Sequence, residues 1–197
     1  MDPEESFHCQ LGRTIQAWLW VESQFYLLYA LLMKGANGHL VSVTFNHIQS
    51  VDAKLGLLSS CLALVLDKER LEWKLWKSLF NKAEKLNKRR NKIVHEPVVK
   101  SFSRGRQTIA VSPSHFNALA LVKGQTTNKS IVVSDGYKPS QAKVLVDHTI
   151  DLAGLHSLER EFKSFSLELR KFQDQVEPIV KAALSAAERN AKVKGAA

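Results

Sequence analysis

The sequence has few cysteines and none of the common metal-binding or phosphate-binding patterns. Cys9 and Cys61 are the only cysteines in 197 residues, too few for a disulfide framework and without a CxxC spacing that could hold a metal. There is no GxxxxGK loop and no GxSxG turn. Five histidines show no metal-ligand spacing with cysteines or carboxylates; they are His39, His47, His115, His148 and His156. We therefore expect a reducing, cytoplasmic setting and neither a metal nor a cofactor.

The chain also lacks the marks of export and of a membrane span. Its start, MDPEESFHCQ, has no basic segment followed by an apolar one, so a secretory signal is not expected. Residues 15–33 are long enough to cross a bilayer, but Glu22, Ser23 and Gln24 lie at their centre. A carboxylate at that depth costs on the order of 3 kcal/mol. We expect a buried core helix and no membrane partner.

What is present indicates a basic globular protein. Hydrophobic residues make up 45% of the chain, and 28 Lys and Arg against 19 Asp and Glu give a net charge of +9. The length fits one domain, predicted over 1–197, with room for an insertion. The positive charge suits nucleic acid or another polyanion.

Hydrophobic periodicity predicts four helices. The first covers about 6–34 and ends at KGANGH; it is apolar on most sides, which suits the centre of a bundle or an interface with a partner chain. The second starts at Thr44 and runs to about 66, and the third runs from an N-cap at Asp67 to His95 or Glu96, before Pro97. The last follows an N-cap at Asp151 and is kinked or interrupted at Pro178.

Residues 97–148 follow a different pattern, with short β-branched runs separated by turn residues. The runs are PVVKSFS, RQTIAVS, NALALV, KSIVVS and KVLVDH. They predict a small antiparallel sheet inserted between helices three and four. The fold class is therefore mainly α, a four-helix bundle with a β insertion.

Most of the excess charge lies in the third helix. Residues 68–92 contain ten Lys or Arg and three Glu. A solvated helix face is the usual explanation for such a run. Alternate steps of four and three residues from Trp76 give a packing stripe, however, and Arg90 is one of its members; the stripe is Trp76, Leu79, Ala83, Leu86, Arg90 and Ile93. Arg90 either points toward a neighbouring helix or extends from the end of the stripe into solvent.

Asn91 and His95 lie one helical turn apart on one face, with Arg90 on its flank. Histidine is the side chain that exchanges a proton most readily near neutral pH, which suits a general acid or base. The competing interpretation is an ordinary histidine that binds the last helical carbonyls.

The segment RNKIVH resembles the RNxxxH form of the R-x4-6-H motif of the HEPN superfamily, small helical-bundle proteins of which many are metal-independent endoribonucleases. The loose motif is expected about once by chance in a chain of this composition, but requiring Asn after Arg at one spacing lowers the expectation to about 0.01. The resemblance covers the helical frame, about 6–96 and 151–192, and only the six-residue motif is specific. The insertion at 97–148 departs from the minimal pattern.

The resemblance implies a role for each matched residue. His95 acts as general base or acid on the ribose 2′-hydroxyl, Arg90 stabilises charge on the scissile phosphate, and Asn91 orients the phosphate or the histidine. It also implies a homodimer with a composite active site, products with 2′,3′-cyclic phosphate and 5′-hydroxyl ends, and a toxin or defence role with an antitoxin or other regulatory protein as partner. The basic residues beside the motif are expected to contact RNA or to remain a solvated surface; they are Lys85, Lys88, Arg89 and Lys92.

Glu22 is a further candidate because it is a carboxylate in an apolar helix. It lies either on a narrow solvated side of that helix or beside a buried cation, for which Arg90 is a candidate. Two other functions remain open. One is a non-catalytic RNA-binding or protein-interaction helical dimer that retains the motif for structure. The other is a structural scaffold with a basic surface.

Overall fold

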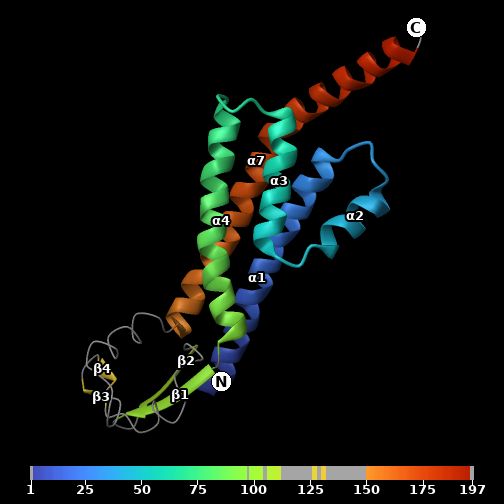
Figure 1. Ribbon diagram of the computed structural model, residues 1–197. Helices are drawn as coiled ribbons and strands as arrows, with labels where there is room; N and C mark the ends of the chain where they lie inside the picture. Colours follow the sequence, from blue (N-terminus) through green and yellow to red (C-terminus); the bar gives the residue numbers. More distant parts are fainter. Residues whose placement is uncertain are drawn as a thin grey trace, which may run out of the picture. The chain divides into compact units, whose positions relative to one another are not determined.

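The computed structural model describes residues 2–96, 98–103, 106–111, 126–127, 130–131 and 150–195. In this part the chain is mainly helical, with short antiparallel strands between the fourth and fifth helices (Figure 1). The elements in chain order are α1 (Pro3–Leu32), α2 (Gly38–His47), α3 (Val51–Val65), α4 (Leu71–His95), β1 (Val98–Ser103), β2 (Arg106–Val111), β3 (Thr126–Thr127), β4 (Ser130–Ile131), β5 (Ile150–Asp151) and α7 (Leu152–Gly195). The predicted class, mainly helical with a small antiparallel insertion, is confirmed to this extent.

Helix α1 agrees with the predicted first helix and ends where the glycines begin. Gly35 follows it with φ of 102°, a backbone conformation that side chains other than glycine rarely adopt. Among the described residues, no helix is both long enough and apolar enough to cross a membrane.

The predicted second helix is wrong in its bounds, because the structure has two helices there. Helix α2 starts at Gly38, where the Asn37 side chain accepts hydrogen bonds from the backbone N–H groups of His39 and Leu40. Ile48 is extended, and Ser50 caps α3 by accepting from the N–H of Ala53 at 3.4 Å. The two local caps outweigh the continuous apolar pattern across this stretch.

Helix α4 begins later than predicted, whereas α7 begins where it was predicted. Asp67 accepts from the N–H of Glu69, but this closes a turn, and the helix itself starts at Leu71. Asp151 is the expected N-cap of α7, since its Oδ1 accepts from the N–H of Gly154 at 2.8 Å. Helix α7 is not interrupted at Pro178, because it continues through this residue to Gly195, while a kink there, the other predicted outcome, stays a prediction.

Three strands form an antiparallel sheet in the order β1-β2-β5. β1 pairs with β2 from Val98 opposite Val111 to Ser103 opposite Arg106, as expected for a hairpin. β5 pairs with β2 and leads directly into α7. β3 and β4 form a second antiparallel pair, and β3 lies where a turn was predicted. The predicted strands NALALV and KVLVDH lie outside the described residues.

The chain divides into two compact units, each made of two stretches of sequence. Unit 1 comprises 1–18 and 88–162, and unit 2 comprises 19–87 and 163–197. Helices α1, α4 and α7 contribute residues to both. This division does not test the single domain predicted over 1–197, which stays a prediction.

The core of unit 1 joins the start of α1 to the start of α7. The rings of Trp18 and Phe162 pack with centroids 5.0 Å apart. Thr14 is fully buried and its hydroxyl lies 2.8 Å from the Gln10 carbonyl and 3.2 Å from the Leu155 carbonyl. Among the described residues, the other buried apolar side chains of this core are Phe7, Ala17, Ile93, Ile109, Val111, Leu155 and Leu158.

The core of unit 2 is built from all five helices. Trp76 of α4 stacks on Phe172 of α7 at 5.7 Å and donates from Nε1 to Ser59 Oγ of α3 at 2.9 Å. Phe25 of α1 packs on Phe165 of α7 at 6.5 Å. The stripe predicted on α4 is therefore a core face in this unit, where its members Trp76, Ala83 and Leu86 are buried. On α7, Phe165, Leu169 and Phe172 are buried as well.

Candidate functional site at the end of helix α4

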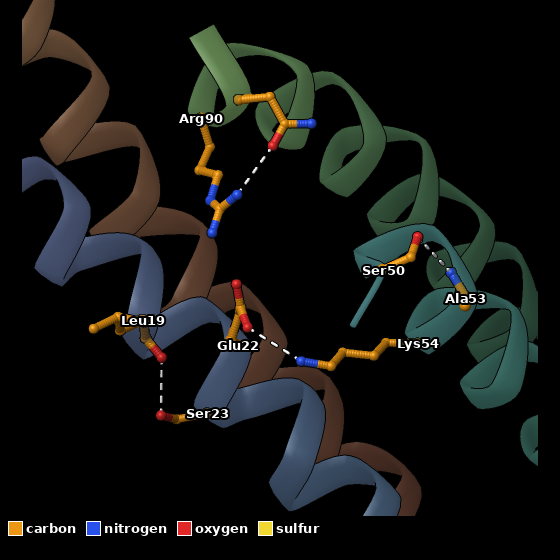
Figure 2. Close-up of polar contacts among 8 residues, drawn as sticks. Leu19, Glu22, Ser23, Ser50, Ala53, Lys54 and Arg90 are labelled. Carbon is orange, nitrogen blue, oxygen red and sulfur yellow. Dashed lines mark hydrogen bonds and ion pairs between the residues drawn. The ribbon is translucent and has the colours of Figure 1, made fainter. Parts of the chain in front are cut away.

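Arg90, Asn91 and His95 all belong to the last two turns of α4, in unit 1. Arg90 is half-buried, whereas Asn91 and His95 are exposed. The Nη1 of Arg90 donates a hydrogen bond to Asn91 Oδ1 at 3.1 Å. Figure 2 shows Arg90 with this bond as a dashed line. Asn91 thus holds the guanidinium from the exposed side of the helix, one turn before His95.

Arg90 occupies the position in the packing stripe at which an apolar residue is expected. Leu86 and Ile93 on either side of it are 4% and 3% exposed. Its Nε is buried and has no hydrogen-bond partner among the described residues. A buried donor without a partner costs about 1 to 3 kcal/mol, and more when it belongs to a charged group. A water molecule or an anionic acceptor would remove this cost.

Buried polar atoms without partners concentrate in this stretch of sequence. Four such atoms are found in the described part of the chain, and three lie within 87–96: Asn87 Oδ1, Arg90 Nε and Glu96 Oε2. Native proteins satisfy most buried polar groups, and the exceptions often mark a site or a bound water. Asn87 and Glu96 were not predicted as site residues from the sequence. The only sign that could have pointed to Asn87 was its polar side chain one turn before Asn91.

Asn87 lies in unit 2 and is 7% exposed. Its Nδ2 donates to Asp52 Oδ1 at the start of α3, at 3.4 Å, and this leaves its oxygen as an acceptor. A buried amide with one satisfied side stabilises the α3–α4 contact less than a fully bonded one. Its free acceptor is available to a water molecule or a ligand.

Arg89 is engaged differently from its neighbour. Its Nη1 forms an ion pair with Glu161 of α7, and Ser157 donates to the other oxygen of that carboxylate at 3.4 Å. Both charged side chains are about two-fifths exposed, so solvent screens the pair and it contributes little stability. Arg89 is therefore matched by a protein carboxylate, whereas Arg90 Nε is not.

The lysines predicted to contact RNA are at the surface to different degrees. Lys85 and Lys88 are exposed, and Lys92 is half-buried. Lys85 belongs to unit 2 and the other two to unit 1. Trp73, half-buried, has Lys77 over its ring at 5.8 Å, whereas Trp76 is a core residue.

Glu22 lies in unit 2, where it pairs with a buried cation. Its Oε2 lies 3.2 Å from Lys54 Nζ of α3, as Figure 2 shows, and the two side chains are 22% and 11% exposed. Lys54 Nζ also lies 5.3 Å from the centroid of the Phe45 ring. Of the two interpretations made from the sequence, pairing with a cation describes Glu22, and Lys54 was not foreseen as the cation. Pairing with Arg90, which belongs to the other unit, stays a prediction.

Other reactive side chains of the described residues give no second centre. Burial raises the pKa of the Cys61 thiol, and burial together with Cys61 raises the pKa of Tyr29. Both groups therefore stay protonated at neutral pH. No group of three or more metal-binding side chains occurs in the ranges that the structure describes.

The comparisons with known proteins add no relative. No protein family, curated protein or solved structure was found to match the chain.

Proposed function

We propose that the chain is a metal-independent endoribonuclease of the HEPN type, with Arg90, Asn91 and His95 as its site. The observation that carries the proposal is the state of Arg90. It is a half-buried guanidinium with one nitrogen bonded to Asn91 and a buried Nε without a partner, five residues before an exposed histidine. Such a guanidinium suits the binding of a phosphate group, and the histidine suits the removal of a proton from the hydroxyl beside that phosphate.

The proposed reaction requires two groups beside the scissile phosphate. His95 accepts the proton of the ribose 2′-hydroxyl, and the 2′-oxygen forms a bond to phosphorus as the bond to the 5′-oxygen breaks. Arg90 stabilises the charge that develops on the phosphoryl oxygens. The leaving 5′-oxygen takes up a proton, which His95 of a second copy would supply in a composite site. The products are a 2′,3′-cyclic phosphate and a 5′-hydroxyl end.

The helical frame is consistent with the proposed family. In unit 2, α1 contacts α3 through Glu22 and Lys54, and α3 contacts α4 through Ser59 and Trp76. Helix α4 contacts α7 through Trp76 and Phe172, and α7 contacts α1 through Phe165 and Phe25. Four helices that contact one another in this cyclic order would make a four-helix bundle, the fold that the resemblance implies.

RNA would approach over the basic residues of α4. Lys85 and Lys88 are exposed and offer charge to the phosphate backbone. Arg89 already has Glu161 as a partner, so we assign it a smaller part in RNA binding than the sequence suggested. A cytoplasmic homodimer acting as a toxin or defence effector, controlled by an antitoxin or another regulatory protein, is the role that the family resemblance implies.

Incubation with RNA in EDTA tests the proposal. Wild type, Arg90→Ala and His95→Ala are compared with His156→Ala, a control in which an exposed histidine of the same unit is removed. We expect wild type and the control to cut RNA, and both site variants to lose about 10² to 10⁴ in rate, the range that a general base or a charge-stabilising donor supplies. Folding of each variant is checked by circular dichroism.

The chemistry of the products separates the proposal from other nucleases. A single 2′-O-methyl group at the cleavage position should prevent cutting, because the attacking oxygen has no proton to lose. Intact RNA with wild type, or equal cutting by all four proteins, would end the nuclease assignment. RNA binding without cleavage would instead favour the non-catalytic RNA-binding dimer.

A further inference from the structure

Trp73 of α4 has surroundings that differ from those of Trp76, three residues later. Trp76 is 1% exposed, stacks on Phe172 and donates to Ser59. Trp73 is half-buried, and the Nζ of Lys77 lies 5.8 Å from the centroid of its ring. Lys77 is exposed and follows Trp73 by one helical turn. Trp73 therefore offers part of an aromatic side chain beside a positive charge at the surface of unit 2.

The helix around Trp73 is basic. From Leu71 to Lys88, α4 contains five lysines and two glutamates. One of the glutamates, Glu72, is paired with Arg70 at 3.3 Å, and the other, Glu84, is half-buried. Four of the lysines are exposed; they are Lys74, Lys77, Lys85 and Lys88. An anionic ligand that lies along this helix therefore meets mainly positive charge.

Trp73 and the candidate site share one face of this helix. Steps of four and three residues lead from Trp73 to His95 through Lys77, Asn81, Glu84, Lys88 and Asn91. All of these side chains are exposed except Trp73 and Glu84, which are half-buried. Trp73 and Asn91 are five turns of 3.6 residues apart, which is about 27 Å along the helix axis.

We propose that Trp73 and Lys77 form a subsite for one nucleotide of single-stranded RNA. The base stacks on the indole ring of Trp73, and Lys77 binds the adjacent phosphate. Proteins that bind single strands combine aromatic side chains, on which bases stack, with a track of positive charge for the backbone. The inference rests on the proposed function for its substrate class, RNA. It adds a place where the strand is held at a distance from the bond that is cut.

The spacing along α4 determines how long an RNA must be to reach both places. A stacked strand advances about 3.4 Å per nucleotide, so about 27 Å corresponds to about eight nucleotides. An RNA that binds at Arg90 and His95 therefore gains the contact with Trp73 only when it exceeds about this length. We expect affinity to rise with length in a step that depends on Trp73.

Trp20 provides a matched control for the aromatic side chain. It is 47% exposed, and the Nζ of Lys163 lies 5.7 Å from its ring centroid, so the pair has the same chemistry as Trp73 with Lys77. From Thr14 to Leu32, however, α1 contains no Lys or Arg. Trp20 thus lies on a helix segment that offers no track of positive charge, and we expect it to take no part in RNA binding.

Fluorescence anisotropy of labelled single-stranded RNA tests the inference, with His95→Ala as the parent protein so that the strand is not cut. Trp73→Ala should weaken the binding of an RNA of about twelve nucleotides at least about fivefold, the loss expected for one stacked base. Trp73→Phe keeps an aromatic ring and should retain most of the affinity. Trp20→Ala should leave it unchanged. Circular dichroism and thermal unfolding confirm that each variant is folded.

Two further measurements locate the contact. In a series of RNA lengths, the parent should gain affinity beyond about eight nucleotides, and Trp73→Ala should lack this step. Crosslinking needs no change at Trp73, so it remains decisive if Trp73→Ala does not fold. RNA that carries 5-iodouridine, which crosslinks to aromatic side chains on which it stacks, should attach to Trp73 and not to Trp20, as identified by mass spectrometry.

The outcomes separate this inference from the ribonuclease proposal. Equal RNA binding by the parent and by a folded Trp73→Ala overturns the inference, as does crosslinking that does not include Trp73. If wild type cuts RNA under either result, the ribonuclease proposal stands without the subsite. If RNA binds through Trp73 and wild type leaves it intact, the subsite stands and the ribonuclease proposal fails. Absence of RNA binding overturns both.

Discussion

Removal of the Lys54 charge should destabilise the protein far more than removal of an exposed lysine. Lys54 Nζ is 3.2 Å from Glu22 Oε2 and 5.3 Å from the Phe45 ring centroid, and the Lys54 side chain is 11% exposed. In Lys54→Met the Glu22 carboxylate keeps its position, 22% exposed, but loses this cation. The substitution preserves most of the aliphatic stem, so the lost charge dominates the effect.

The magnitude follows from the geometry. Two charges 3.2 Å apart attract by about 5 kcal/mol at an effective dielectric constant near 20, and desolvation of the two ions offsets much of this. Breaking a fully buried pair costs about 3 to 5 kcal/mol. Because Glu22 keeps some contact with water, we expect about 2 kcal/mol for Lys54→Met. For a chain of this size that lowers the Tm by about 4 to 8 °C.

Urea denaturation followed by circular dichroism measures these free energies. The set comprises Lys54→Met, Glu22→Gln and the double variant, whose cost should be less than the sum of the two single costs by at least about 1 kcal/mol. Lys181→Met is the matched control, because Lys181 pairs with Glu177 at 2.6 Å but both side chains are about half exposed. It should leave the free energy of unfolding almost unchanged, because solvent screens an exposed pair.

Equal effects of Lys54→Met and Lys181→Met would refute this reasoning, because burial of the pair would then have no energetic consequence. Strict additivity of Lys54→Met and Glu22→Gln would refute it as well, since it would mean that the two side chains do not interact.

Two further predictions concern α7 and the cysteines. Asp151→Ala removes the acceptor of the Gly154 N–H and should cost about 1 kcal/mol in urea denaturation, while Asp151→Asn, which keeps an acceptor, should cost markedly less. Cys61 should react with iodoacetamide more slowly than the exposed Cys9 at neutral pH, as measured by mass spectrometry; because its pKa is raised, its reaction should accelerate only at more alkaline pH, and equal rates at neutral pH would count against burial as the cause.

Periodicity and local caps predicted much of the helical frame. The stripe from Trp76 to Ile93 and the N-cap at Asp151 are both local features of the sequence. They can therefore be predicted without knowledge of the tertiary contacts. The break between α2 and α3 was missed because IQS contains neither glycine nor proline. The helical pattern is interrupted there because the Ser50 side chain caps the start of a new helix, α3.

In the candidate site, too, the local features were predictable from the sequence and the tertiary contacts were not. The positions of Arg90, Asn91 and His95 at the end of one helix follow from spacing and from Pro97. The partners of the charged residues do not, because Arg89 meets Glu161 and Glu22 meets Lys54 across long stretches of sequence. The local sequence pattern does not distinguish the role of Arg89 from that of Arg90. The structure does, because Arg89 forms an ion pair whereas the Nε of Arg90 is buried.

The interleaved composition of the two units has a consequence for synthesis on the ribosome. Each unit needs an early and a late stretch of the chain, and unit 2 is completed only by residues 163–197. Contacts between residues so far apart in sequence form slowly, since a long loop must close first. The nascent chain therefore carries the apolar face of α1 uncovered until α7 emerges, and we expect it to depend on a chaperone during that interval.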